Sequence, residues 1–231
     1  MQKLDTKING NAIKILALIT MLIDHIGFML FPTLDILRII GRISMPLFAY
    51  MIAEGCFYTK NRKKHFLLIF GLGVFCQVVY LVAMNSLLMG VLISFSISIL
   101  IIYAIDNAKI KKSVISFLIA VFSILLALFI TILLPKLLRG SGLIFDYGYL
   151  LIWLPIAVYY CKNKLSKLTA LAVFLIAICM TGGWGLQWYS LISLIPLALY
   201  NGKRGKYNIK YLFYIFYPLH LAIISGISYL I

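Results

Sequence analysis

Apolar residues run through the chain in nine stretches of helix length, separated by short polar or basic segments. The stretches cover residues 12–31, 34–57, 66–83, 87–105, 114–134, 147–160, 168–180, 186–200 and 211–231. A membrane span needs about 20 mostly apolar residues, with a lower limit near 17, so the sixth to eighth stretches are short. Lipid favours helices or closed barrels, and the alternation of barrel strands is missing from the sequence. The pattern predicts an all-α polytopic membrane protein, a bundle of about nine transmembrane helices, with eight or ten as alternatives.

Basic residues fall in alternate loops, which gives the bundle an orientation. With the N-terminus in the cytoplasm, 17 of the 21 Lys and Arg residues lie in the N-terminal segment and the inside loops. These residues are Lys3, Lys7, Lys14, Lys60, Arg62, Lys63, Lys64, Lys109, Lys111, Lys112, Lys162, Lys164, Lys167, Lys203, Arg204, Lys206 and Lys210. The outside loops carry Lys136 and Arg139. Because cytoplasmic loops are enriched in Lys and Arg, we expect a multi-pass protein of the cell membrane with a cytoplasmic N-terminus.

Composition supports the membrane assignment and excludes several other classes. Hydrophobic residues make up 64% of the chain and charged residues 12%, whereas soluble domains are nearer half apolar and a quarter charged. No polar stretch is long enough to fold separately, so residues 1–231 are expected to form one integral membrane domain. The net charge of +15 lies in short clusters between apolar stretches, which favours contacts with anionic lipids and argues against a nucleic-acid partner. The four cysteines show no metal-ligand spacing, and no metal site is expected.

Three ionisable residues fall inside the first two predicted helices. Asp24 and His25 lie about six residues before the outer end of the first helix, and Arg42 lies about eight residues into the second. At roughly 1.5 Å per residue, all three are expected about 10 Å below the outer surface. The short turn at Pro32 makes the helices antiparallel neighbours, so Asp24 is expected to contact Arg42. A histidine beside a paired carboxylate is what a general base requires, so His25 is a candidate for this role.

The last apolar stretch contains the second intramembrane histidine. His220 lies near the middle of the membrane if residues are counted from the inner end of the stretch, and is therefore expected to be deeper than His25. Tyr217 precedes it by three residues and shares its helix face. Pro218 lies between them, removes one backbone hydrogen bond and favours a kink. This face is a candidate pocket wall, although an aromatic face at this spacing is also typical of simple packing.

Arg38 and Arg42 are four residues apart on one helix face, with Asp35 at its outer end. The pair could bind an anion, or Arg38 could form an ion pair with Asp35. Asp24 and Arg42 could likewise form a buried ion pair that only fixes helix packing. Intramembrane charges are also typical of transporters, so an ion or proton relay and a non-catalytic scaffold remain alternatives to an enzyme.

Three segments carry a resemblance to a known family: residues 13–27 (IKILALITMLIDHIG), residues 37–50 (LRIIGRISMPLFAY) and residues 216–220 (FYPLH). They resemble the TraX family, the pilin acetylases of conjugation systems. The last segment is also similar to sequences in the wider group of transmembrane acyltransferases. The resemblance follows the helix order through the whole chain and is most specific in the first 65 residues.

The resemblance implies an acetyltransferase that takes acetyl groups from cytoplasmic acetyl-CoA as a co-substrate, with no tightly bound cofactor. His25 would then deprotonate an acceptor amine or hydroxyl, or carry the acetyl group itself. Asp24 and Arg42 would hold the charge and geometry of the site, and His220 with Tyr217 would line the pocket or stabilise the oxyanion. Lys60 and Arg62, with Arg38, are the candidate residues for binding the donor. The acceptor, a peptide, a pilin-like N-terminus or a glycan, is not identified by the sequence.

The charge pattern makes a direct prediction about topology. Reporter fusions placed at Lys111 and at Arg139 are expected to lie on opposite sides of the membrane, with Lys111 inside. The two positions are separated by one predicted helix, so activity of both fusions on the same side would contradict the nine-helix arrangement.

Overall fold

The computed structural model describes residues 8–84, 86–182, 185–207, 209–228 and 230. The predicted cytoplasmic lysines Lys3 and Lys7 and the predicted end of the last stretch, Ile231, lie outside these residues. The chain divides into two compact units, one formed by Met1–Met51 and Asn163–Ile231 and the other by Ile52–Lys162. Each unit is described by itself. The expectation of a single membrane domain stays a prediction.

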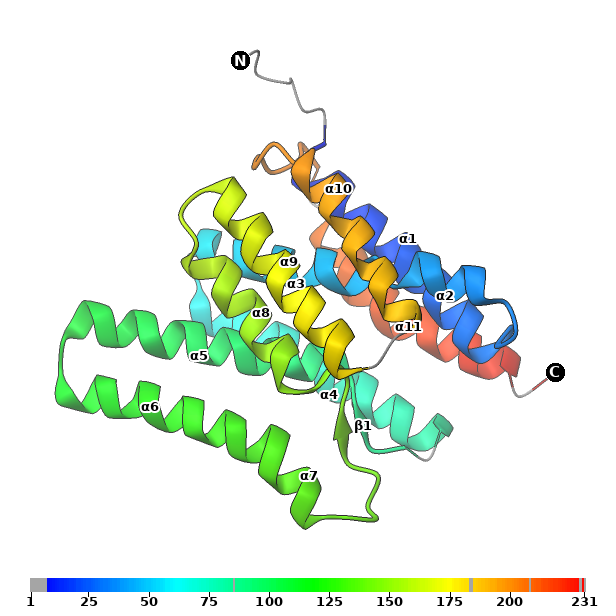
Figure 1. The fold of residues 1–231 in the computed structure, drawn as a ribbon, viewed down its shortest axis with the longest axis horizontal. Helices are drawn as coiled ribbons and strands as arrows, with labels where there is room; N and C mark the ends of the chain where they lie inside the picture. Colours follow the sequence, from blue (N-terminus) through cyan, green and yellow to red (C-terminus); the bar gives the residue numbers. More distant parts are fainter. Residues whose placement is uncertain (1–7, 85, 183–184, 208, 229, 231) are drawn as a thin grey trace. The chain divides into compact units, whose positions relative to one another are not determined.

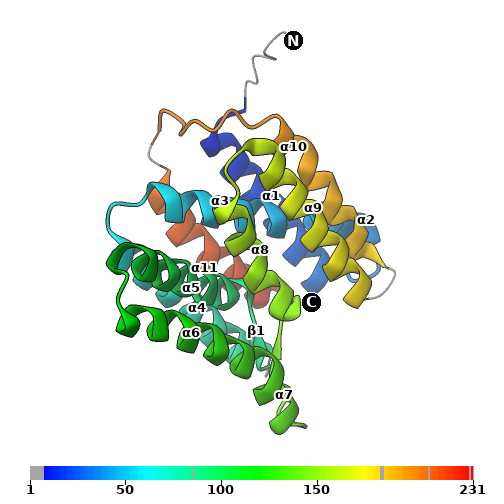
Figure 2. The ribbon, with the colours of Figure 1, turned by 60° about the vertical axis from the view of Figure 1, so that its left-hand side comes forward.

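The first unit is built from helices at both ends of the chain (Figure 1). Its elements are α1 (Gly10–Met29), α2 (Asp35–Gly41), the start of α3 (Ser44–Tyr58), α9 (Lys164–Thr181), the 3-10 helix η2 (Leu186–Ser193), α10 (Leu194–Ala198) and α11 (Lys210–Ser228). Helix α1 packs against α2 and against α11, which brings the first and last helices of the chain together (Figure 2).

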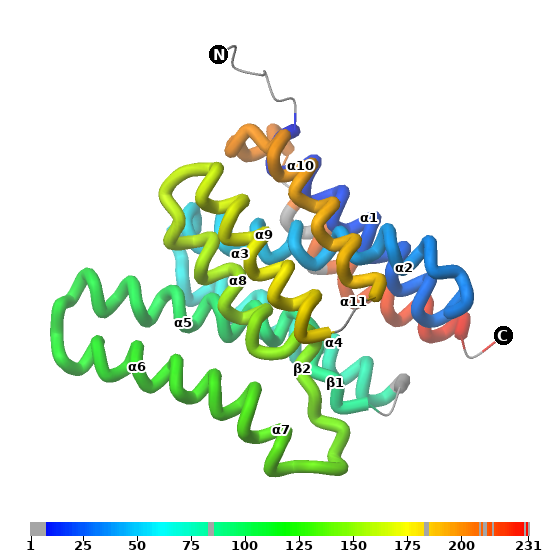
Figure 3. The backbone as a smooth tube through the Cα atoms, in the orientation of Figure 1, coloured from blue at the N-terminus to red at the C-terminus, as the bar shows by residue number. Residues whose placement is uncertain are grey.

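The second unit holds the rest of α3 and the elements that follow it in the chain. They are α4 (Arg62–Met84), β1 (Leu88–Met89), α5 (Val91–Lys111), α6 (Val114–Leu128), the π-helical segment η1 (Phe129–Leu133), α7 (Leu134–Leu137), β2 (Ile144–Phe145) and α8 (Gly148–Tyr160). The strands β1 and β2 form one short parallel pair, seen side by side in Figure 3.

The predicted fold class is confirmed: the chain is an all-α polytopic membrane protein, and its described residues include two strands of two residues each. Six helical segments among the described residues are long and apolar enough to cross a membrane. Three further apolar helices are shorter: Gly148–Tyr160, Leu186–Ala198 and Ile215–Ser228. The first two of these coincide with the sixth and eighth predicted stretches, which were already short. The seventh stretch extends to a full span because Asn163 and Ser166 form a capping box that begins α9 at Lys164.

Two of the predicted spans are interrupted. The second span divides at Arg42 and Ile43 into α2 and α3, with Pro46 in the first turn of α3, where proline is tolerated. The fifth contains η1, where the hydrogen-bonding pattern changes before α7. Interrupted helices of this kind line binding sites in many membrane proteins.

Glycines allow α1 and α2 to approach each other closely. A Cβ atom on Gly27 of α1 would lie 2.7 Å from the Cβ of Leu37 on α2, and a Cβ on Gly41 of α2 would collide with the Asp24 side chain. Small residues at such positions let membrane helices bring their backbones together. Close packing at these two glycines therefore fixes α2 over the part of α1 that carries Asp24.

This packing predicts a selective effect of adding one methyl group. We expect Gly41→Ala to destabilise the protein by at least about 1–3 kcal/mol, because the methyl group and the Asp24 carboxylate need the same space. Gly71→Ala in α4 is the matched control, since a Cβ there meets no atom within 4 Å. Heating the detergent-solubilised variants and measuring the surviving monodisperse fraction gives the comparison. Equal survival of Gly41→Ala and wild type would show that the close approach is not required.

Candidate functional site

Asp24 is the centre of an ion-pair cluster between α1 and α2. Its carboxylate accepts hydrogen bonds from Arg42 Nη2, at 2.7 Å from Oδ1 and 2.9 Å from Oδ2. It also accepts one from Arg38 Nη1, at 2.8 Å from Oδ2, and the same Arg38 nitrogen donates to the Asp24 carbonyl at 3.0 Å. The predicted contact between Asp24 and Arg42 is confirmed. Arg38 joins the same carboxylate, rather than forming the ion pair with Asp35 that the sequence left open.

The spacing of the two arginines explains why one carboxylate can receive both. Arg38 and Arg42 are one helical turn apart, and Gly41 leaves room for the Asp24 carboxylate beside them. The side chains of Asp24, Arg38 and Arg42 are only 17%, 22% and 14% exposed. A charge at the centre of a membrane helix costs about 2.5–3.5 kcal/mol, which pairing offsets. One carboxylate balances one of the two guanidinium groups, so the cluster carries a formal charge surplus of one.

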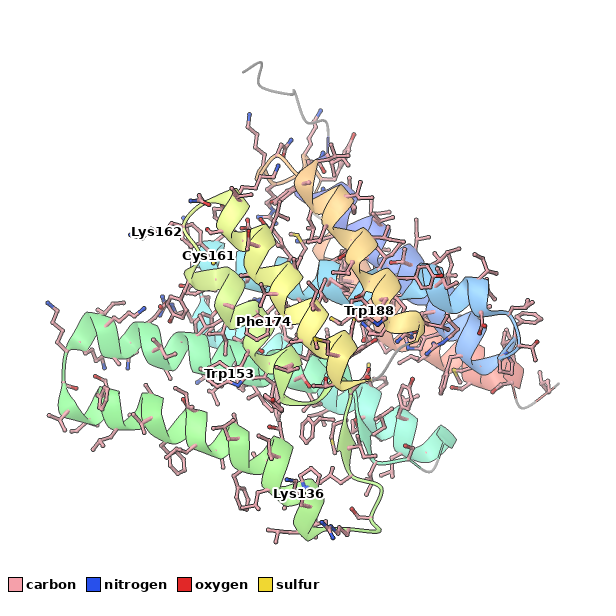
Figure 4. The ribbon with its side chains drawn as sticks, viewed as in Figure 1. Lys136, Trp153, Cys161, Lys162, Phe174 and Trp188 are labelled. Atoms are coloured by element: carbon pink, nitrogen blue, oxygen red, sulfur yellow. The ribbon has the colours of Figure 1, made fainter. Side chains whose placement is uncertain are left out.

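Arg42 lies at the break between α2 and α3, and it links the cluster to η2. Its Nη1 donates to the side-chain oxygen of Gln187 at 3.3 Å. Gln187 is the second residue of η2 and precedes Trp188, which is labelled in Figure 4. A 3-10 run of eight residues is unusually long, and such segments often occur at functional positions. Gln187 is therefore a member of the site that the sequence prediction did not include.

A signal for Gln187 was present in the sequence. Gln187, Ser190 and Ser193 recur every third residue within an otherwise apolar stretch. Residues three apart are eclipsed in a 3-10 helix, so the three polar side chains share one face. Ser190 and Ser193 are completely buried. The spacing indicates a 3-10 helix with a polar inner face, whereas the hydrophobicity of the stretch predicted only a span.

His25 and His220 lie in contact, although 195 positions separate them in the chain. The Nε2 of His220 is 3.3 Å from the Nδ1 of His25, and the two ring centroids are 5.0 Å apart in an edge-on arrangement. The contact brings the two histidines into one site, and their expected difference in depth stays a prediction.

The backbone contacts of the two rings fix their tautomers. His25 Nδ1 lies 2.9 Å from the Met21 carbonyl, and His220 Nδ1 lies 2.8 Å from the Phe216 carbonyl. A carbonyl oxygen only accepts, so each Nδ1 carries the hydrogen and donates it one helical turn back. The one hydrogen on His25 Nδ1 is then shared between the Met21 carbonyl and the Nε2 of a neutral His220. In this arrangement His25 Nε2 keeps its lone pair, which makes it the basic nitrogen of the pair.

Aromatic rings hold His220 in place. Phe216 stacks on its ring at 5.2 Å between centroids, and Tyr217 meets it edge-on at 5.6 Å. Tyr217 also packs against Phe48 of α3. The predicted association of Tyr217 with His220 is confirmed, and helix α11 continues through Pro218. These contacts limit the orientation of His220 and, through it, of His25.

The candidate donor-binding residues Lys60 and Arg62 belong to the second unit. Arg62 forms an ion pair with Asp106 at 2.9 Å, and the hydroxyl of Tyr159 donates to the same carboxylate oxygen at 2.6 Å. The Arg62 side chain is 40% exposed, and Lys60 is exposed. Arg62 is therefore already engaged by a carboxylate, whereas Lys60 is open to solvent. Their role with a donor stays a prediction.

Among the described residues, no group of three or more His, Cys, Asp or Glu side chains could hold a metal ion. The histidine pair and the Asp24 cluster instead offer acid–base chemistry and anion binding. His25, a member of the histidine pair, directly follows Asp24 in the chain.

Comparison with known proteins identifies relatives over almost the whole chain. The family model described as TraX protein matches residues 9–228. A protein named "Probable fimbrial assembly protein FimC" from Dichelobacter nodosus is 23% identical over 234 residues, covering 93% of each chain. An uncharacterized protein of Rickettsia prowazekii (strain Madrid E) is 50% identical over 52 residues, which make up 22% of this chain and 21% of that protein. No solved structure matches this chain.

The geometry of the cluster predicts which combination of substitutions restores folding. We expect Asp24→Asn to destabilise the protein by about 3–5 kcal/mol, because two arginines lose their counter-charge. Adding Arg42→Gln is expected to recover only part of this loss, since Arg38 remains unpaired. The triple variant that also carries Arg38→Gln should recover the most. Yield of monodisperse protein and thermal stability measure the series, and full recovery by the double variant alone would contradict a role for Arg38.

Proposed function

Since this chain belongs to the TraX family, we propose that it is a membrane acetyltransferase in which His25, oriented by His220, acts on the acceptor. Acetyl-CoA is the donor and approaches from the cytoplasmic side of the cell membrane. The observation that carries the proposal is the contact between the two intramembrane histidines, in which His25 carries its hydrogen on Nδ1 and keeps Nε2 as a basic nitrogen. A buried ion pair that only fixes packing would not require it.

In the proposed reaction the acceptor amine or hydroxyl attacks the carbonyl carbon of the acetyl thioester. His25 Nε2 takes the proton that the acceptor loses, the carbon–sulfur bond breaks, and the electron pair leaves with the CoA sulfur. The proton on His25 then passes to the thiolate, which returns the ring to its neutral form. His25 could alternatively attack the thioester itself and carry the acetyl group, in which case the acceptor attacks acetyl-histidine.

The other residues have supporting roles in this proposal. His220 Nε2 accepts a hydrogen bond from His25 Nδ1, shared with the Met21 carbonyl, and so orients the ring, as the orienting residue does in other base-assisted sites. Arg38 and Arg42, held in place by Asp24, supply positive charge near the negative oxygen that develops on the attacked carbonyl. Tyr217 restricts His220 from the side. Lys60 remains a candidate for attracting the phosphates of the donor.

The acceptor is proposed from the relatives. The D. nodosus relative is named as a fimbrial assembly protein, which favours a pilin-like peptide amine as the acceptor. A glycan or lipid hydroxyl would use the same chemistry at His25.

A carrier is the second candidate function, and one observation favours it. The second span breaks at Arg42, within the charged cluster, and broken helices commonly form the ion sites of transporters. The two functions separate in one experiment. An enzyme moves labelled acetyl groups from acetyl-CoA to an acceptor, whereas a carrier moves a solute across sealed proteoliposomes without covalent transfer.

The enzyme proposal predicts different defects for the two histidines. We expect His25→Ala to lower acetyl transfer about 10²–10⁴-fold, because the general base is lost, while acetyl-CoA still binds. His220→Ala should lower transfer less, because His25 keeps its bond to Met21. Transfer of radiolabelled acetyl groups to membranes from a strain lacking the protein gives the rate, and donor binding is measured separately. Acetyl transfer near the wild-type rate by a folded His25→Ala variant would contradict the role of His25 as the general base.

A further inference from the structure

The Asp24 cluster has one more positive charge than its single carboxylate balances. Two guanidinium groups contact the single Asp24 carboxylate. Asp35 is the other carboxylate among the described residues of this unit; it is exposed on the first turn of α2 and forms no ion pair with a described residue. Residues 163–231 contain no Asp or Glu at all. The surplus charge therefore has no partner carboxylate within the described part of the unit.

The face of the Phe28 ring contacts Arg38 without removing this surplus. The Arg38 guanidinium carbon lies 5.0 Å from the centre of the ring. A cation–π contact of this kind stabilises the position of the cation. The ring carries no net charge, so the formal charge of the cluster stays at plus one.

Gln187 adds a second and independent observation. Arg42 has only donors, so the Gln187 atom facing it must be the oxygen, and the amide NH₂ points elsewhere. That nitrogen is buried and has no hydrogen-bond partner within the described ranges. A buried donor without an acceptor is unfavourable, and such groups in a native structure often mark the position of a missing ligand. The amide therefore needs an acceptor next to the cationic cluster.

The surplus charge and the amide donor require the same kind of partner. We propose that Arg38, Arg42 and Gln187 bind an anionic oxygen group, a phosphate or a carboxylate, carried by the acceptor a few bonds from the amine or hydroxyl that is acetylated. The proposal rests on the acetyltransferase function and names its substrate class. Guanidinium groups suit both anions because they donate in a fixed planar geometry. The partial exposure of Asp24, Arg38 and Arg42 leaves the cluster open to such a group.

Binding of simple anions tests the site without knowledge of the full acceptor. The protein is placed in nanodiscs of phosphatidylcholine, and its thermal unfolding is followed by tryptophan fluorescence. Phosphoethanolamine and inorganic phosphate are the probes, and ethanolamine and chloride at equal ionic strength are the controls. A ligand that binds only the folded state raises the unfolding midpoint in a saturable way. We expect both phosphates to do so and both controls to have no such effect.

Arg38→Gln and Lys206→Gln locate the binding. The first removes the surplus charge and keeps the Asp24–Arg42 pair, and phosphate should bind at least about tenfold more weakly to it, as for the loss of one charge-assisted hydrogen bond. The second removes an exposed charge from a basic loop and should leave phosphate binding unchanged. No response of the wild type, or equal responses of both variants, would overturn the proposal.

Gln187→Glu provides a test in the opposite direction. The new carboxylate would lie against Arg42 and balance the surplus charge from within the protein. We expect this variant to unfold at a higher temperature than wild type and to lose its response to phosphate. A less stable variant that still responds to phosphate would contradict the proposal.

The phosphate-binding experiments contain no acetyl-CoA, so their outcome is independent of the acetyltransferase assay. Acetyl transfer without phosphate binding would overturn the anion site and leave the enzyme. Phosphate binding without acetyl transfer would preserve the site and remove the proposed reaction.

Discussion

The pairing of one carboxylate with two arginines is the constraint on which the first unit depends. Asp24 on α1 holds Arg38 and Arg42 of α2, and the glycine between them lets the helices come close enough for the contact. Arg42 caps the C-terminal end of α2 and donates a hydrogen bond to Gln187 of η2. The Arg42 guanidinium group therefore also positions η2. An ion pair in a membrane is expensive to break, which makes it an effective way to fix three elements relative to one another.

The histidine pair is positioned by the same packing. His25 follows Asp24 in α1, so fixing the Asp24 side chain fixes the turn of helix that carries the ring. Helix α11 then packs on α1 and brings His220 to it, with Phe216 and Tyr217 restricting the ring. Each Nδ1 is held by a carbonyl of its own helix, which removes the freedom of both rings to change tautomer. Charge, packing and hydrogen bonding therefore act together to present one nitrogen, His25 Nε2.

Much of this arrangement could be predicted from the sequence because membrane physics is strict. Helix length depends on bilayer thickness, so the all-α class and the order of the apolar helices could be predicted from the apolar stretches. The orientation from loop charge stays a prediction. The Asp24–Arg42 contact followed from the short turn at Pro32. The contact between His25 and His220 could not, since depth along separate helices says nothing about which helices are neighbours. Gln187 was missed because the stretch around it is apolar enough for a membrane span. The three-residue spacing of the polar residues in this stretch differs from the spacing expected for an α-helix.

The most direct measurement of the account is the protonation of the histidine ring nitrogens in the folded protein. The chain has three histidines, so nitrogen NMR of histidine-labelled protein in lipid, with a His65→Gln variant to remove the third, gives resolved signals for His25 and His220. The account predicts hydrogen on Nδ1 of both rings, a bare Nε2 on His25, and a through-space contact between His25 Nδ1 and His220 Nε2. Hydrogen on Nε2 of a neutral His25, or no contact between the rings, would contradict it.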